Sequence, residues 1–155
     1  MMKNSRNICI VWALIAAVFV MGCCIGLLVE RHAKEQAALQ ADEICRNAAQ
    51  EAHDAFQAYW NTGDPAQYDR GTDCLAVFVE TYPRTTREGT SYNTVLPAVH
   101  GARSRLCSLD GNLTEKEMDF VLGGLALLAE DHGSITGAVY LELFSRGQGL
   151  WYETT

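Results

Sequence analysis

Proline and basic residues are scarce in this chain of 155 residues. Only three prolines occur, and residues 30 to 60 lack both proline and glycine, so nothing in that stretch favours a break in a helix. Twelve Lys and Arg stand against 19 Asp and Glu, and no Lys/Arg cluster longer than two occurs after residue 7. The lack of basic clusters argues against nucleic acid, and against an anionic membrane surface, as a partner of that part of the chain.

Sequence motifs of catalysis are also missing. The chain contains no GxSxG, P-loop, GxGxxG or HExxH motif. Its four histidines do not share a helix face at a spacing of three to five residues, and His53 and Asp54, being adjacent, should point to different faces. We therefore predict no catalytic, cofactor-binding or metal-binding residues, and expect surface or hydrogen-bonded histidines at positions 32, 53, 100 and 132.

A long apolar run is present near the N-terminus. Residues 8–29, ICIVWALIAAVFVMGCCIGLLV, contain no charge and no proline. As a helix this run would span roughly 33 Å, enough for a bilayer core of about 30 Å. It also exceeds the apolar core of a signal peptide, about 7 to 15 residues. We predict a transmembrane anchor over 8–29.

The charges beside this run bear on its orientation. Lys3 and Arg6 precede it, and Arg31 and Lys34 follow it, so the basic residues are balanced. The free amino terminus then favours a cytoplasmic tail at 1–7, a signal anchor at 8–29 and a domain outside the cell membrane.

A lipoprotein is an alternative to the transmembrane anchor. The letters VMGC at 20–23 resemble a poor lipoprotein box in which Cys23 would carry the lipid. The apolar run continues past that cysteine, whereas the new N-terminus of a lipoprotein normally turns polar. Lipidation at Cys23 therefore remains the second choice.

Small residues form a candidate packing face within the anchor. Gly22 and Gly26 make a G-x-x-x-G pattern, and Ala13 and Ala17 make another small-residue face. Such faces let two membrane helices approach closely. The sequence thus predicts a homodimer through the transmembrane helix.

The rest of the chain shows helical periodicity. The anchor should continue as a helix to about Trp60, with an inward stripe that includes Ala41, Ile44 and Cys45. The letters GDP at 63–65 provide a stop, an N-cap and a first-turn proline. We expect further helices over about 64–82, 92–106 and 114–131. Pro97 should kink or begin the helix over 92–106, and the helix over 114–131 should be buried on all sides. A final helix or strand should cover 135–144, before a loose tail at 149–155 held only by Trp151 and Tyr152.

The letters DGNLTEKE at 110–117 resemble the second half of a calcium-binding EF-hand loop. In that register the first ligand position falls on Leu106, where a carboxylate is needed. Thr114 and Glu117 also match a capping box, which begins a helix. The same letters contain an Asn-Leu-Thr glycosylation sequon at Asn112. We interpret the segment as a turn and a helix cap.

Three cysteines follow the anchor. Helix arithmetic places Cys45, Cys74 and Cys107 at different heights of the bundle, too far apart for disulfides, so we predict three free thiols in the core. A cysteine beside a histidine would make a thiol-dependent enzyme or redox protein, and this is the main alternative function.

These observations predict an all-α protein. A single N-terminal transmembrane helix continues into a four- to five-helix bundle at 30–148. The leading functional hypothesis is a membrane-anchored helical domain that binds a protein or envelope component.

Overall fold

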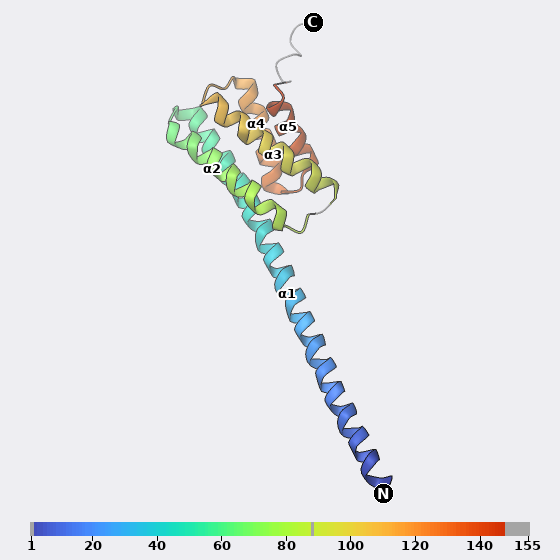
Figure 1. The fold of residues 1–155 in the computed structure, drawn as a ribbon. Helices are drawn as coiled ribbons and strands as arrows, with labels where there is room; N and C mark the ends of the chain where they lie inside the picture. The colour runs from blue at the N-terminus through green and yellow to red at the C-terminus, as the bar shows by residue number, and fades with distance from the viewer. Residues whose placement is uncertain (1, 88, 148–155) are drawn as a thin grey trace. The chain divides into compact units, whose positions relative to one another are not determined.

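A computed structural model describes residues 2–87 and 89–147, and for residues 2–11 and 13 the backbone alone. All regular structure in this part of the chain is helical, which confirms the predicted class (Figure 1). The tail at 149–155, with Trp151 and Tyr152, lies outside the described residues. The elements are α1 (Met2–Thr62), α2 (Pro65–Thr81), the 3-10 helix η1 (Tyr82–Arg84), α3 (Thr90–Leu109), α4 (Glu115–Glu130) and α5 (Ile135–Ser145).

The chain divides into two compact units, Met1–Ala37 and Ala38–Thr155. In the first unit, every described side chain from Leu14 to Val29 is exposed. This helix is long and apolar enough to cross a membrane. The ion pair between Glu30 and Lys34, which are four residues apart, has an N–O distance of 2.7 Å.

The second unit has its own apolar core. The C-terminal part of α1 and the whole of α2 form a hairpin, in which the predicted stop and cap are confirmed. Gly63 has a positive φ of 70°, and the Asp64 side chain accepts a hydrogen bond from the backbone N–H of Ala66 at 3.0 Å. The aromatic rings of Phe56, Phe78 and Tyr82 are fully buried in the core.

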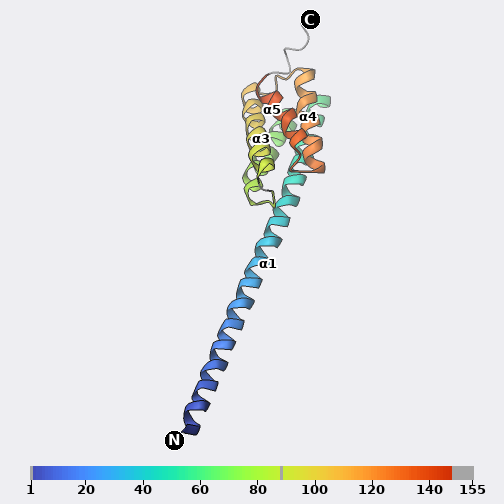
Figure 2. The ribbon, with the colours of Figure 1, turned by 90° about the vertical axis from the view of Figure 1, so that its right-hand side faces the viewer.

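Helices α3, α4 and α5 complete the second unit, and α5 packs against both others (Figure 2). A Cβ on Gly124 would lie 3.0 Å from the carbonyl oxygen of Gly137, so these two glycines let the backbones of α4 and α5 approach. Residues 135–145 form a helix, which decides between the two alternatives for this segment. Pro97 lies inside α3 and does not begin it.

Two predictions of burial are wrong. Ala126 of α4 is exposed and Leu122 is only half-buried, so α4 buries one face instead of all sides. Ile44 was placed in the inward stripe of α1, but its side chain is 46% exposed. Adjacent residues lie about 100° apart around a helix. Cys45 takes the inward position at 0% exposure, and the side chain of Ile44 falls on the outer side of it.

Candidate functional site

The loop between α3 and α4 holds the segment that resembles a calcium site. The predicted capping box is confirmed there: the Thr114 hydroxyl accepts a hydrogen bond from the Glu117 N–H, and Glu117 Oε2 accepts one from the Thr114 N–H at 3.0 Å. Glu117 Oε1 accepts a hydrogen bond from Arg105 at 2.7 Å. Burial favours the protonated carboxyl, but these bonds outweigh it and lower the pKa of Glu117. Oε2 therefore caps the start of α4, and Oε1 joins it to Arg105 of α3.

The three cysteines of the second unit are free thiols in three different environments. Cys45 is fully buried, and its Sγ lies 3.8 Å from the Phe78 carbonyl oxygen. Burial, aided by the charge of Asp42, raises the pKa of Cys45 to about 12. A thiol with such a pKa stays protonated at neutral pH, which makes it a poor nucleophile.

The other two thiols differ from the prediction of core residues. Cys74 is half-buried, and its Sγ lies 3.9 Å from Glu51 Oε2. Burial and the neighbouring carboxylates raise the pKa of Cys74. Cys107 is exposed on α3. The core prediction therefore holds for Cys45 alone, because positions 74 and 107 fall at the edge and on the outside of their helices.

The histidines also divide into two kinds. His32 and His100 are exposed. His53 Nδ1 lies 3.1 Å from Asp54 Oδ1, so the expectation that these neighbours point apart is wrong. Adjacent residues lie only about 100° apart around a helix, which leaves their side chains within reach of each other. His132 is 5% exposed and lies in the turn between α4 and α5. It is the histidine with the most distinctive surroundings.

His132 faces Asp42 of α1 across the bundle. Its Nε2 lies 3.1 Å from Asp42 Oδ1, which is within ion-pair distance, but the angle between the two groups does not allow a hydrogen bond. The same carboxylate accepts hydrogen bonds from the Thr86 N–H at 2.9 Å and the Thr86 hydroxyl at 2.7 Å. Burial pushes the pKa of Asp42 upwards, but the bonds from Thr86 and the charge of His132 outweigh it and lower the pKa. Asp42 therefore joins three segments of the chain: α1, the α2–α3 connection and the α4–α5 turn.

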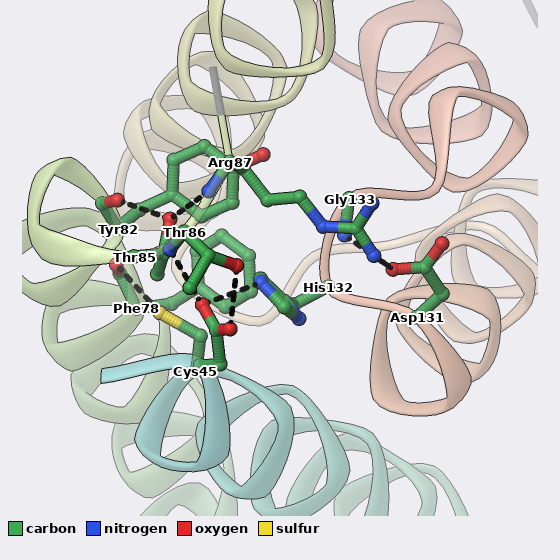
Figure 3. A network of polar contacts seen from close by, with 10 residues as sticks. Cys45, Phe78, Tyr82, Thr85, Thr86, Arg87, Asp131, His132 and Gly133 are labelled. Atoms are coloured by element: carbon green, nitrogen blue, oxygen red, sulfur yellow. Dashed lines mark hydrogen bonds and ion pairs between the residues drawn. The ribbon is translucent and has the colours of Figure 1, made fainter. Parts of the chain in front are cut away.

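Arg87 extends this group of polar residues towards α4. Its guanidinium forms an ion pair with Asp131, and Asp131 also accepts a hydrogen bond from the Gly133 N–H at 3.0 Å (Figure 3). Tyr82 lies in the same network, and its ring meets the ring of His132 edge-on at 6.1 Å between centroids. Its hydroxyl is buried, and none of the described residues forms a hydrogen bond with it. Burial raises the pKa of Tyr82 to about 12.

These residues line an open polar hollow of about 320 Å³, formed by Leu39, Asp42, Arg46, Arg87, Glu130, Asp131 and His132. Both acidic and basic side chains line it. The Thr86 hydroxyl donates to the Asp42 carboxylate, and the lowered pKa of Asp42 makes that carboxylate a weak base for activating a nucleophile. Among the side chains that the structure describes, no three His, Cys, Asp or Glu are grouped to hold a metal ion. The arrangement is suited to joining α1, the α2–α3 connection and the α4–α5 turn.

Sequence reasoning could not find this network. Asp42 and His132 are separated by 90 residues, and no local pattern pairs them. The sequence offered only a weak sign of a buried histidine, namely His132 beside a glycine in the turn after a predicted helix. Only the folded arrangement shows that its ring turns inwards.

A second hollow lies between α1 and α2 and is more apolar. It encloses about 170 Å³ and is lined by Ile44, Asn47, Ala48, Glu51, Cys74 and Val77. Ile44 and Val77 are 46% and 45% exposed, so two large aliphatic side chains face solvent at its edges. We call this feature the α1–α2 groove. The sequence reasoning missed it because it assigned Ile44 to the core.

The predicted features of the anchor lie in the first unit. Among the atoms that the structure describes, a Cβ added to Gly22 or Gly26 would meet none within 4 Å, so both positions leave room for a close approach. Cys23 is an exposed free thiol. Neither self-association nor lipidation is tested by this arrangement, and both stay predictions.

No family model matches this sequence, and no curated protein or solved structure shows detectable similarity to it.

Proposed function

We propose that the chain is a single-pass membrane protein whose helical domain binds a protein or envelope component. One observation carries the proposal: the apolar side chains of residues 14–29 are exposed, although the second unit has a closed core of its own. A contiguous apolar surface of this size is not stable in water and is suited to a bilayer. The domain needs none of these side chains for its own packing.

The cysteines support recognition over thiol chemistry. Reactive cysteines have a lowered pKa in an electropositive setting. The pKa values of Cys45 and Cys74 are raised instead, and carboxylates lie beside both thiols. A surface that binds a partner needs no such activation.

The orientation belongs to the same proposal. The N-terminus lies in the cytoplasm and the acidic domain lies outside, anchored by residues 8–29. A homodimer can form through Gly22 and Gly26 of the anchor without changing the surface of the domain.

Membrane extraction and reporter fusions test this function. We expect the full chain to stay in membranes washed with alkaline carbonate, and residues 31–155 to be soluble and mainly helical by circular dichroism. A reporter that is active only outside the cytoplasm should work at the C-terminus and fail at the N-terminus. Release by carbonate, or the reverse reporter pattern, would contradict the proposal. Fatty-acid labelling lost in Cys23→Ser would replace the anchor with a lipoprotein.

A further inference from the structure

The α1–α2 groove combines an apolar floor with an exposed aliphatic edge on each side. Ala48 is 6% exposed and forms the floor together with the half-buried Cys74. Ile44 stands on the α1 side and Val77 on the α2 side. Leaving two large aliphatic side chains half exposed beside one hollow is unfavourable in water, and a partner that covers both would gain from their burial.

The size of the groove indicates what kind of group it can take. Sites for small molecules usually enclose about 300 to 1,000 Å³. At about 170 Å³ the groove is smaller, and it is open along the helices. It therefore suits an anchoring side chain that belongs to a larger partner, as in the centre of protein interfaces.

Carboxylates dominate the surroundings of the groove. Glu51 lines it. On α2, Asp73 lies four residues before Val77 and Glu80 lies three residues after it, and both are exposed, so they flank the Val77 side chain on the same helix face. The raised pKa of the Cys74 thiol has the same origin: burial first, then the charges of Glu51 and Asp73, against that of Arg70. Arg70 pairs with Glu51 at 3.4 Å between exposed side chains, which is a weak contact.

This charge pattern distinguishes between two occupants. A second copy of the domain would bring its own acidic edge against this one, and like charges facing each other weaken association. A partner with Lys and Arg beside its apolar residues would complement the edge. Helices with one apolar and one basic side dock into grooves in this way.

We propose that the α1–α2 groove binds a basic amphipathic helix of another protein, an inference that rests on the proposed function. An aliphatic side chain of that helix enters between Ile44 and Val77, above Cys74. Its basic residues lie against Asp73 and Glu80.

Cys74 provides a local probe of this binding. We would place the full chain in nanodiscs of zwitterionic lipid and follow alkylation of Cys74 by peptide-resolved mass spectrometry, with the exposed Cys107 as internal reference. The probe is a peptide of about 18 residues, five helical turns, with Leu on one face and Lys on the other. A peptide with Glu in place of Lys is the charge control.

We expect the Lys peptide to slow alkylation of Cys74 and to leave Cys107 unchanged. At a concentration about ten times the Kd, only about one-tenth of the grooves stay free, so the rate should fall about tenfold. Val77→Asp should abolish this protection. Val139→Asp on α5 is the matched control, since Val139 is 43% exposed against 45% for Val77, and it should keep the protection.

Three outcomes would overturn the proposal: no protection of Cys74, equal protection by the Glu peptide, or equal loss in the two valine variants. If Cys74 is protected in the absence of peptide and this protection disappears on dilution, the groove is occupied by a second copy of this chain, and the proposal is also overturned. Each of these results leaves membrane insertion and orientation untouched, because carbonate extraction and reporter fusions measure them separately.

Discussion

Gly71 of α2 lies directly against the ring of Phe56 in α1. A Cβ at position 71 would come 2.7 Å from Cζ of that ring and within 3 Å of two further ring atoms. Both residues are buried. The glycine therefore sets how closely the two helices of the hairpin approach, although glycine is a poor helix former.

We predict that Gly71→Val destabilises the domain by about 1 to 3 kcal/mol, because the side chain has to displace the Phe56 ring in a packed core. Gly123→Ala is the control: its Cβ would lie 3.6 Å from Tyr140, an ordinary contact, so the better helix propensity should stabilise the domain by up to about 1 kcal/mol. Urea unfolding of residues 31–155, followed by circular dichroism, measures both. Similar effects at the two positions would mean that close packing does not explain Gly71.

The register of the hairpin is the part of the fold that the sequence predicted best. Counting outwards from the turn at Gly63 placed Cys45 and Cys74 at different heights. In the structure Cys45 lies beside Phe78, and Cys74 lies beside Glu51. Fixed rise per residue makes such counting reliable when a turn is well marked by Gly, Asp and Pro.

The candidate sites were beyond this kind of reasoning. Periodicity assigns a residue to the inward side of a helix only within the width of the apolar stripe, so adjacent residues such as Ile44 and Cys45 cannot be distinguished. The contact of His132 with Asp42 depends on how the α4–α5 turn folds back onto α1. Nothing in one sequence encodes that distance locally. The groove and the polar hollow therefore became visible only with the bundle assembled.

Two buried tyrosines should respond oppositely to loss of the hydroxyl. The Tyr68 hydroxyl donates a hydrogen bond to the Leu106 carbonyl at 2.7 Å, whereas the Tyr82 hydroxyl has no hydrogen-bond partner in the part of the chain that the structure describes. Tyr68→Phe should cost about 0.5 to 1.5 kcal/mol because it removes this hydrogen bond, while the Leu106 carbonyl keeps the one from the Asp110 N–H at 3.2 Å. Tyr82→Phe should be neutral or stabilising. Thermal and urea unfolding compare the pair, and a larger loss at position 82 would contradict the structure.

The three thiols of the domain should differ in reactivity. We expect alkylation of the native domain to follow the order Cys107, then Cys74, then Cys45. At pH 8 a thiol with a pKa of about 12 is ionised in about one molecule in ten thousand, and Cys45 is fully buried as well. Mass spectrometry of alkylated peptides gives the order, and unfolding in urea should make all three equal. A two-dalton loss with two unalkylated cysteines would reveal a disulfide and contradict the hairpin register.

Self-association of the anchor should depend on its small residues. We predict that Gly26→Ile weakens the association of the span in a membrane two-hybrid assay, because the branched side chain keeps two helices apart. Ala13→Ile is the comparison on the other small-residue face, and a loss of signal in that variant alone would assign the contact to that face instead. Equal signals from the wild type and Gly26→Ile would remove the G-x-x-x-G face as a dimer contact.

His132 should make the stability of the domain depend on pH. Burial lowers its pKa below the usual 6.5, and Arg87 and Arg46 add to this, while Asp42 and Asp131 act against it. The unfolded chain then takes up the proton more readily, so the free energy of unfolding falls as the pH drops below about 6.5 and is fully recovered above it. The lowered pKa of Asp42 gives a loss of stability only in more acidic solution, as that carboxylate becomes protonated below about pH 4.

Urea midpoints between about pH 5 and 7.5 isolate the histidine. His132→Gln should reduce the slope of the urea midpoint against pH in this range. Asp42→Asn should lower the stability and steepen that slope, because the Asp42 carboxylate makes the largest contribution in favour of the charged His132 ring. Equal slopes in the wild type and His132→Gln would show that another group titrates there.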